Sequence, residues 1–230
     1  MSEKTIIALP SKGRLMEQAS HLFDEAGIAI ERSGNARGYF GRLSGFDNVE
    51  IRFLSASEIA HNLNSAEVHL GITGEDLLRE TIHNFDSTIN IEKRLGFGPA
   101  DVVVAVPESW LDVATMADLE EASQDFLRTH TRRLRVATKY INLTRQFFAA
   151  KGVTGYQTVE SSGATEGAPA AGTAEIIVDI TSTGSTLRAN NLKILSDGVI
   201  LKSEAVLATT KSPGLTMEQS QVLQQIVDLL

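Results

Sequence analysis

The segment TIIALPSKGRLMEQASHLFDEAG, Thr5 to Gly27, indicates the fold class of this chain. Its first part, Thr5–Leu9, is a short β-branched and apolar run, which is typical of a buried strand. After Pro10 the apolar spacing becomes helical, and one face carries Leu15, Ala19, Leu22, Phe23 and Ala26. Gly27 stands where a glycine commonly ends a helix. The chain therefore opens with a strand, a turn and a helix.

The same alternation recurs along the chain. Apolar runs predict further strands over residues 49–55, 68–73, 100–107, 133–138, 175–181 and 199–209. Helices are predicted after most of them, including residues 116–130 and a terminal amphipathic helix. Ser57 is expected to cap the helix after residue 55, and Thr216 and Gln219 have capping-box spacing. Strands that alternate with helices predict an α/β fold with mostly parallel sheets.

Length and composition limit the class of protein. At 230 residues, with 42% hydrophobic residues, the chain has material for one or two domains. It has no cysteine, no apolar run of membrane-spanning length and no signal-peptide pattern at its start. A cytoplasmic location is therefore predicted. The net charge of −8 argues against nucleic acid or an anionic membrane as a partner, although local cations could still bind a phosphate.

The end of the predicted strand over residues 175–181 has the strongest chemical pattern. Asp179 ends an apolar run, and a dense group of small residues follows it: Ser182, Thr183, Gly184, Ser185 and Thr186. Such a loop exposes backbone N–H groups and hydroxyl donors, and the next helix would add its positive end. Asp179 could accept from ribose hydroxyls. The pattern favours a sugar-phosphate site, and the alternative is a simple helix-capping turn.

Other strand ends carry candidate residues with weaker patterns. Lys12 and Arg14 flank a glycine at a helix start, where cations disfavour the helix unless a phosphate docks there. Lys139 and Tyr140 follow a strand, and Glu166 lies in a loop that could bring a second carboxylate near Asp179. Each of these side chains could also be an ordinary exposed residue without a binding role. The histidines show no HExxH spacing, and G-x-S-x-G is absent, so neither a zinc enzyme nor a serine hydrolase is indicated.

Several segments in order resemble the ATP phosphoribosyltransferases, which catalyse the first step of histidine biosynthesis. They are ALPSKGRL, GITGEDLL, LGFGPADVVVAVP, RVATKYINLTRQFF and SSGATEGAPAAGTAEIIVDITSTGSTLRANNL. The resemblance covers essentially the whole chain. The chain ends where longer members of the family continue into a regulatory domain, so it resembles the short form. That form works with a regulatory subunit related to histidyl-tRNA synthetase.

The resemblance also implies a fold and a domain division. The family has two α/β domains like those of type II periplasmic binding proteins, with the active site in the interdomain cleft. Domain I would comprise residues 1–95 and 190–230, and domain II would comprise residues 96–189. The implied reaction joins N1 of ATP to C1 of phosphoribosyl pyrophosphate and releases pyrophosphate, with Mg²⁺ bound to the substrate.

The resemblance implies roles for individual residues. The phosphoribosyl pyrophosphate site would contain Glu166, Asp179, Ser182, Thr183, Gly184, Ser185 and Thr186. Lys12 and Arg14 would act on the leaving group, as electrostatic rather than nucleophilic catalysts. The ATP site would contain Arg37, Gly74, Asp76, Lys139 and Tyr140. For Gly74 and Asp76, the residues alone favour helix capping instead.

The sequence differs from the family pattern at one position, and two other functions are compatible with the predicted fold. Where the family usually has an arginine after the second strand, this chain has Ser55, and Arg52 or a partner residue would have to replace it. A solute-binding protein without catalysis could share the fold. A type I phosphoribosyltransferase also has a hydroxyl-rich loop, but its two adjacent acids are missing here, since Val178 and Ile180 flank Asp179.

Overall fold

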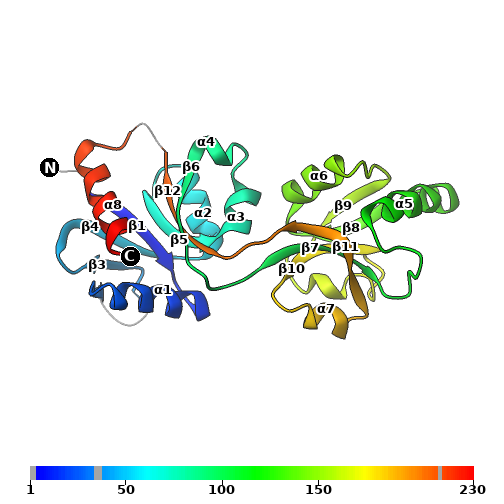
Figure 1. Cartoon of the computed structure of the whole chain (residues 1–230), viewed down its shortest axis with the longest axis horizontal. Coiled ribbons are helices and arrows are strands. Elements are labelled where there is room, and N and C mark those ends of the chain that lie inside the picture. The colour runs from blue at the N-terminus through cyan, green and yellow to red at the C-terminus, as the bar shows by residue number, and fades with distance from the viewer. Residues whose placement is uncertain (1–3, 34–37, 212–213) are drawn as a thin grey trace. The chain divides into compact units, whose positions relative to one another are not determined.

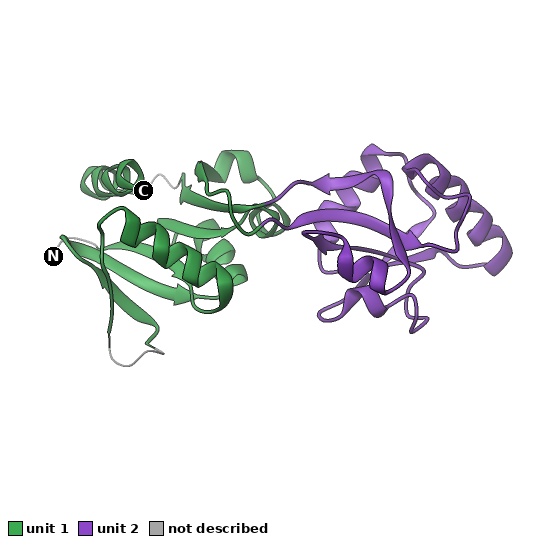
Figure 2. Ribbon diagram, turned by 60° about the horizontal axis from the view of Figure 1, so that its bottom comes forward, with its two compact units in different colours: residues 1–98, 204–230 green, residues 99–203 purple. Residues whose placement is uncertain are grey.

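The computed structural model describes residues 4–33, 38–211 and 214–230, and these form two compact units. Unit 1 comprises Met1–Gly98 and Glu204–Leu230, and unit 2 comprises Pro99–Ser203, so the chain passes between them twice (Figure 2). The expected boundary after residue 95 lies close to the first passage. The expected boundary at residue 190 differs from the second, because residues 192–201 pair with a strand of unit 2.

Unit 1 is built on a sheet in which the described strands lie in the order β2-β3-β4-β1-β5-β12-β6 (Figure 1). These strands are β1 (Thr5–Pro10), β2 (Ile30–Arg32), β3 (Phe40–Leu43), β4 (Phe46–Leu54), β5 (Leu70–Gly74), β6 (Ile89–Arg94) and β12 (Ala205–Thr210). The helices are α1 (Gly13–Glu25), α2 (Ala56–Asn64), α3 (Glu75–Thr81), α4 (Phe85–Thr88) and α8 (Met217–Leu229).

Alternation along the strands gives the sheet of unit 1 two apolar faces. Ile7 and Leu9 of β1 pack in one cluster with Phe23 of α1 and Leu223 of α8. Ala8, between them in sequence, packs in another cluster with helices α2 and α3. Successive side chains of a strand point to opposite faces, so a strand covered on both sides must be apolar at every position. This accounts for the continuous apolar run at Thr5–Leu9.

One edge of this sheet gathers the carboxyl ends of five described strands, β1, β2, β4, β5 and β6. β1 pairs in parallel with β4 and with β5. β12 is antiparallel to both β5 and β6, so β6 runs in the same direction as β5. Helices α1, α2 and α3 begin just after β1, β4 and β5. This carboxyl edge of unit 1 is where ligands bind in open α/β sheets.

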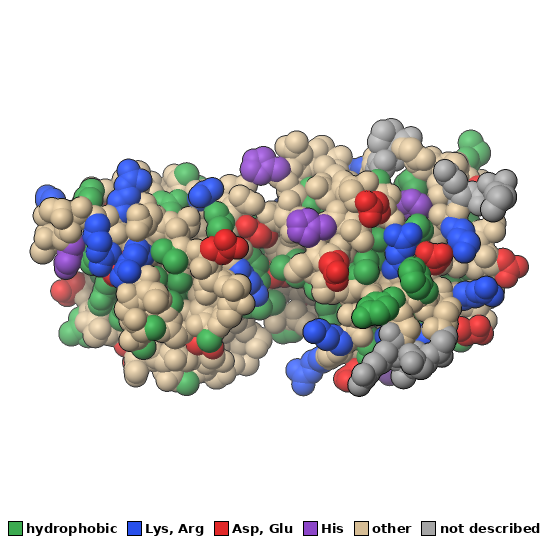
Figure 3. Space-filling view, turned by 180° about the vertical axis from the view of Figure 1, so that it is seen from behind, with side chains coloured by type: hydrophobic (Ala, Val, Ile, Leu, Met, Phe, Trp, Pro, Cys, Tyr) green, Lys and Arg blue, Asp and Glu red, His purple; other side chains and the backbone are tan. Residues whose placement is uncertain are grey.

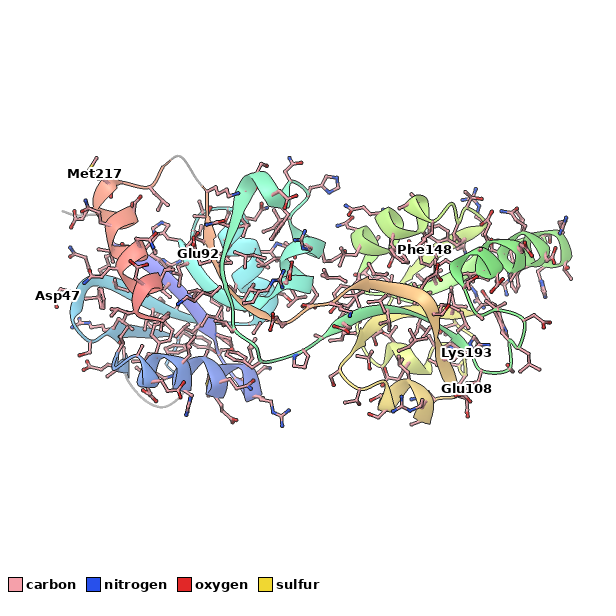
Figure 4. All side chains as sticks on the ribbon, in the orientation of Figure 1. Asp47, Glu92, Glu108, Phe148, Lys193 and Met217 are labelled. Atoms are coloured by element: carbon pink, nitrogen blue, oxygen red, sulfur yellow. The ribbon has the colours of Figure 1, made fainter. Side chains whose placement is uncertain are left out.

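Unit 2 has a smaller sheet in the order β11-β7-β10-β8-β9. Its strands are β7 (Asp101–Pro107), β8 (Leu134–Thr138), β9 (Tyr156–Glu160), β10 (Ile176–Thr181) and β11 (Leu192–Leu201). Its helices are α5 (Met116–His130), α6 (Ile141–Ala150) and α7 (Ser185–Ala189), with a 3₁₀ turn, η1, at Thr165–Gly167. Phe148 of α6 is fully buried, with its ring centroid 4.7 Å from that of Tyr156 (Figure 4).

The structure confirms the α/β character and corrects three details. The sheets are mixed rather than mostly parallel, because β12 and β7 each pair with two antiparallel neighbours. The single strand predicted at residues 199–209 is two strands, since the chain leaves unit 2 between β11 and β12. The cap of α2 is Ser55 rather than Ser57, and it forms a capping box with Glu58. Among the described helices, none combines the length and apolar character needed to cross a bilayer.

A partly buried ion pair in unit 2 predicts a dependence of stability on pH. Arg135 and Arg132 donate to the Glu175 carboxylate at 2.6 Å and 3.0 Å, and the Arg135 backbone N–H donates at 2.8 Å. Burial raises the pKa of Glu175, but these hydrogen bonds outweigh it and lower the pKa from 4.5 to about 2. A lowered pKa means that the carboxylate stabilises the fold above pH 4.5, and that this stability is lost as pH falls towards 2.

We therefore expect the free energy of unfolding to fall between pH 5 and pH 2, with Glu175 contributing roughly 3 kcal/mol of that loss. Urea unfolding at several pH values measures this free energy. The Glu175→Gln variant should be less stable at pH 7 and should lose less stability on acidification. The exposed Glu121 of α5 provides the control variant Glu121→Gln. Equal pH slopes for wild type and Glu175→Gln would contradict the expectation.

Candidate functional site

The candidate site of unit 2 begins where β10 ends. Asp179 pairs in register with Val103 of β7, and beyond Thr181 the chain leaves the sheet. Gly184 then takes a left-handed backbone conformation with φ of 71°, and α7 starts at Ser185. This φ is favourable only for glycine. The strand thus fixes Asp179, and the glycine turns the hydroxyl-rich loop back over the end of the strand.

These residues line one cavity of about 300 Å³. Glu166 reaches it from η1 and Asp179 from β10, and the loop contributes Ser182, Thr183, Ser185 and Thr186. Gly184 lies within the same loop. The structure therefore brings together two carboxylates and five hydroxyl side chains, those of the four loop residues and of Thr181, that lie up to twenty residues apart in the sequence, from Glu166 to Thr186. The cavity is also lined by Pro99 and Ala100, which sequence reasoning did not identify.

Hydrogen bonds within the loop hold its shape. The Gly184 N–H donates to Thr181 Oγ1 at 2.8 Å, and Thr183 Oγ1 donates to Ser185 Oγ at 2.9 Å. Arg188 Nη2 donates to the Thr183 carbonyl oxygen at 3.2 Å. Because α7 has only five residues, its dipole adds less than the sequence suggested. An anion in this loop would be bound mainly by backbone N–H groups and hydroxyls.

The Asp179 carboxyl group has a perturbed pKa. Burial raises its pKa, and the charge of Glu166 raises it further. A hydrogen bond from the Ile180 N–H, 2.8 Å from Asp179 Oδ1, and the positive charge of Lys139 act in the opposite direction. The raised pKa means that the fold holds a carboxylate in a place that disfavours its charge. Perturbed groups of this kind in a cavity are typical of functional sites.

Lys139 and Tyr140 follow β8, next to β10 in the sheet. Val178 of β10 pairs with Thr138, so Lys139 lies beside the end of β10 and its charge acts on Asp179. Tyr140 is fully buried, and the Lys139 Nζ atom lies 5.0 Å from its ring centroid. The buried Tyr140 ring has no exposed face on which a base could stack, and its assignment to the ATP site stays a prediction.

Lys12 and Arg14 lie at the carboxyl edge of unit 1, and both are exposed. Lys12 occupies the N-cap position of α1, with an extended φ of −159°. Neither a side-chain cap nor an acidic residue occupies the first turn of α1, whereas α2 is capped by Ser55. The first turn of α1 therefore keeps backbone N–H donors and two cations together, as an anion site requires.

The segment after β5 is more buried than expected for an ATP contact. Asp76 is 4% exposed, and a Cβ atom on Gly74 would lie 2.3 Å from Asp76 Oδ1. The Asp76 side chain thus folds back over Gly74, which requires glycine there. This geometry favours the helix-capping interpretation of Asp76. Arg37, also predicted for ATP, lies outside the described residues.

Comparison with known proteins decides the family. The family model described as ATP phosphoribosyltransferase matches residues 55–230. An ATP phosphoribosyltransferase of Mesorhizobium japonicum is 61% identical over 206 residues, which is 89% of each chain. Another, from Rhodopseudomonas palustris, is 55% identical over 228 residues, which is 99% of this chain and 70% of the relative. The chain belongs to the ATP phosphoribosyltransferase family.

Membership of the ATP phosphoribosyltransferase family confirms the predicted resemblance, the enzyme class of pentosyltransferases and the link to histidine biosynthesis. Solved structures agree on the fold. The Thermotoga maritima ATP phosphoribosyl transferase (HisG:HisZ) complex has a TM-score of 0.72 at 22% identity, covering 98% of this chain and 96% of that one. A histidine kinase sensor domain with similarity to periplasmic binding proteins has a TM-score of 0.50 at 13% identity, covering 98% and 92%.

Within this family, the hydroxyl-rich loop provides a prediction at Gly184. Alanine there would have to hold φ at 71°, and its Cβ atom would lie 2.9 Å from Arg188 Nη1. We expect Gly184→Ala to destabilise the chain by about 1–2 kcal/mol and to weaken binding of phosphoribosyl pyrophosphate about 10-fold, because the loop must rearrange. Calorimetry measures the affinity.

Gly152 supplies the matched control for Gly184→Ala. It lies after α6, has φ of 75°, and a Cβ atom there would meet nothing within 4 Å. Gly152→Ala should cause similar backbone strain and leave the affinity for phosphoribosyl pyrophosphate unchanged. The assignment of the loop would be contradicted if both variants bound the substrate equally well.

Proposed function

We propose that this chain transfers the 5-phosphoribosyl group from phosphoribosyl pyrophosphate to N1 of ATP, and that it binds the sugar phosphate in the cavity of unit 2. One observation carries the binding proposal: Glu166, Asp179 and the loop of four hydroxyl residues converge on a single cavity of about 300 Å³. That volume is at the lower end of ligand pockets, and it suits a ribose phosphate better than a whole nucleoside triphosphate.

The two parts of this cavity suit the two parts of a ribose phosphate. The side chains of Ser182, Thr183, Ser185 and Thr186, with the backbone N–H groups of the loop, would donate hydrogen bonds to the 5-phosphate. The carboxylates of Asp179 and Glu166 would accept from the ribose hydroxyls. Asp179 must be ionised for this, so the raised pKa of its carboxyl group makes binding sensitive to acid.

We propose that Mg²⁺ enters bound to the pyrophosphate of the substrate. The described residues contain no group of three or more His, Cys, Asp or Glu side chains arranged to hold a metal ion. A magnesium site made of one or two carboxylates and substrate phosphates fits the donor set of Asp179 and Glu166. When bound, the ion would supply positive charge that stabilises the departing pyrophosphate.

The proposed reaction needs little acid–base help from the protein. The lone pair of adenine N1 forms the new bond to C1 of the ribose, while the bond from C1 to the pyrophosphate oxygen breaks. Charge develops on the leaving pyrophosphate, and Lys12 and Arg14 are proposed to stabilise it. Lys139 lies beside Asp179, so we propose that it contacts a phosphate rather than the base. We propose that Gly74 contacts ATP through its backbone, since the Asp76 side chain lies over its α-carbon.

A regulatory partner is the least direct part of the proposal. The related Thermotoga maritima structure is a HisG:HisZ complex, which supports a similar hetero-oligomer here. We propose a histidyl-tRNA-synthetase-like regulatory subunit, as expected for a short-form enzyme, and a cytoplasmic location. Purification of the tagged protein from its native host, followed by identification of stoichiometric partners, tests the first point. Recovery of the catalytic chain without a second subunit would contradict it.

The activity is tested by mixing the purified chain with ATP, phosphoribosyl pyrophosphate and Mg²⁺ and measuring released pyrophosphate. We expect release that requires both substrates, together with formation of phosphoribosyl-ATP. A solute-binding protein would bind a ligand and release no pyrophosphate, and a type I enzyme would accept a different base. If the chain alone releases no pyrophosphate, the assay is repeated with the regulatory subunit. Release only in the presence of that subunit shows that the chain needs its partner for activity.

The binding site is tested separately by a crystal soaked with phosphoribosyl pyrophosphate. The proposal expects the 5-phosphate within hydrogen-bond distance of the loop at Thr183 to Thr186. A sugar phosphate bound elsewhere would overturn the assignment of the cavity without affecting the assignment of the family.

A further inference from the structure

The arginine that the resemblance leads us to expect at residue 55 is absent, and a different arginine lies at the carboxyl edge of unit 1. Ser55, at the position where the resemblance expects arginine, is occupied in capping α2. Arg52, the replacement suggested by sequence, bonds Glu50 through Nε at 3.3 Å. Its side chain lines a cavity with Lys4 and His69, which precede β1 and β5 and therefore mark the opposite edge of the sheet. Arg52 is thus directed away from the carboxyl edge.

Arg94 lies at the carboxyl edge. It is the last residue of β6, and β6 runs in the same direction as β1 and β5. Arg94 pairs with Val206 of β12, and the adjacent Ala205 pairs with Gly74, so Arg94 ends level with the start of α3. The loop that follows approaches α1, because a Cβ atom on Gly98 would lie 3.6 Å from Leu15 Cδ1. Both substrate-binding segments predicted for unit 1 therefore lie along the same edge.

The Arg94 guanidinium group is anchored at one corner and open elsewhere. Its Nη1 atom lies 2.5 Å from Glu75 Oε2 and 3.9 Å from Glu204 Oε1. The Nε and Nη2 atoms have no hydrogen-bond partner among residues 4–33, 38–211 and 214–230, and the side chain is 50% exposed. An arginine fixed through one nitrogen presents its other N–H groups in a fork that matches two phosphate oxygens.

Glu75 explains why the guanidinium is held so firmly. Its side chain is fully buried, and Arg79 Nε also donates to it, at 2.8 Å. Burial raises the pKa of Glu75, but the hydrogen bonds from Arg94 and Arg79 lower it below its usual value, so the carboxylate stays charged. Arg79 is differently placed, because its guanidinium lies 4.3 Å from the centroid of the Phe85 ring. The Arg79 side chain is 33% exposed and that of Arg94 is 50% exposed, so Arg94 presents the more accessible guanidinium group.

We propose that Arg94 binds a polyphosphate group at the carboxyl edge of unit 1, either the triphosphate of ATP or the pyrophosphate of the sugar substrate. The proposal rests on the proposed transferase function and adds a binding residue to it. Glu75 is a positioning residue that orients Arg94. Glu204 makes only the longer contact with Nη1, so it leaves the outward N–H groups available.

The test must separate phosphate binding from the structural role of the ion pair, since Arg94→Gln alone would leave Glu75 buried without a partner. Glu75→Gln is the reference variant, because the amide oxygen of glutamine still accepts a hydrogen bond from Arg94 and keeps it oriented. The double variants Glu75→Gln/Arg94→Gln and Glu75→Gln/Arg79→Gln are compared with it. Relative to the reference, loss of Arg94 should raise the KM of one substrate about 10-fold, because charge-assisted hydrogen bonds are lost. Loss of Arg79 should change neither KM by more than about threefold.

The substrate whose KM rises identifies the polyphosphate that Arg94 binds. Calorimetry with inorganic pyrophosphate and with ATP gives an independent readout that needs no turnover, and melting temperatures check that all three variants fold alike. Equal KM values and affinities for the reference and the Arg94 double variant would show that Arg94 is structural only. Absence of pyrophosphate release by the wild type in complex with its partner would instead contradict the transferase function.

Discussion

Replacing Asp179 with asparagine is expected to lower kcat/KM for phosphoribosyl pyrophosphate by about 100-fold or more, and at the same time to raise the melting temperature. The loss of activity follows from the proposed contact, because a carboxylate that accepts from two ribose hydroxyls contributes about 3 kcal/mol or more, and an amide oxygen accepts less strongly. Steady-state kinetics and thermal unfolding measure the two effects on the same samples.

The rise in stability follows from the raised pKa of Asp179. Burial and the charge of Glu166 raise this pKa in the fold. The protonated carboxyl group therefore favours folding at low pH, and that advantage is lost as pH rises through the folded value. At neutral pH the ionised group costs stability, and asparagine removes the cost. The difference in melting temperature between wild type and Asp179→Asn should shrink as pH falls.

Asp179 also predicts the pH dependence of substrate binding. The KM of the wild type for phosphoribosyl pyrophosphate should increase as pH falls through the raised pKa of Asp179, and Asp179→Asn should lack this dependence. Asp112, exposed in the segment between β7 and α5, gives the control variant Asp112→Asn, which should match the wild type in activity. If Asp179→Asn kept its kcat/KM within twofold of wild type, the proposed contact with the ribose would be wrong.

Replacing Lys12 with alanine is expected to lower kcat about 100-fold with little change in either KM, because its charge is proposed to act on the leaving pyrophosphate in the transition state. Lys12 is exposed at the start of α1 and caps no helix with its side chain, so the melting temperature should change little. Rapid-quench measurement of pyrophosphate release separates the chemical step from product release.

Two further variants make the Lys12 result specific. Lys12→Arg keeps the charge and should recover much of the lost rate. Lys211→Ala removes an exposed lysine that follows β12, at the opposite edge of the sheet, and should leave kcat unchanged. A Lys12→Ala variant with unchanged kcat and a raised KM would contradict a leaving-group role. It would show that Lys12 binds the substrate equally strongly in the ground state and in the transition state.

One face of the molecule carries side chains of both charges. Figure 3 shows Lys and Arg side chains on both units, and on unit 1 they lie among Asp and Glu side chains. The net charge of −8 therefore does not prevent local cation sites, because ions in solution screen charges beyond about 10 Å. The negative total is compatible with binding of polyphosphates at the start of α1.

Much of the candidate site in unit 2 could be predicted from the sequence because the relevant signals are local. Asp179 and the loop from Ser182 to Thr186 are adjacent in sequence, and the abrupt change from apolar to hydroxyl residues marks the end of β10. Glu166 was predicted from its place in a loop that could bring a second carboxylate near Asp179, and it lines the same cavity. The sequence did not indicate Arg94, because its proposed role depends on the ion pair with Glu75, which is nineteen residues away in sequence. No local pattern distinguishes it from an ordinary arginine at a strand end.

The sequence by itself determined the order of most elements, the helix cap at Thr216 and the resemblance to the family, since periodicity, capping and motifs are properties of neighbouring residues. Only the tertiary structure decided the order of strands in each sheet and the break between β11 and β12, where the chain returns to unit 1. It also decided that Tyr140 is buried and that Arg94 faces solvent from a buried partner. The physical reason is that burial and ion pairing arise from contacts between distant segments, and a single chain read in order does not specify which segments meet.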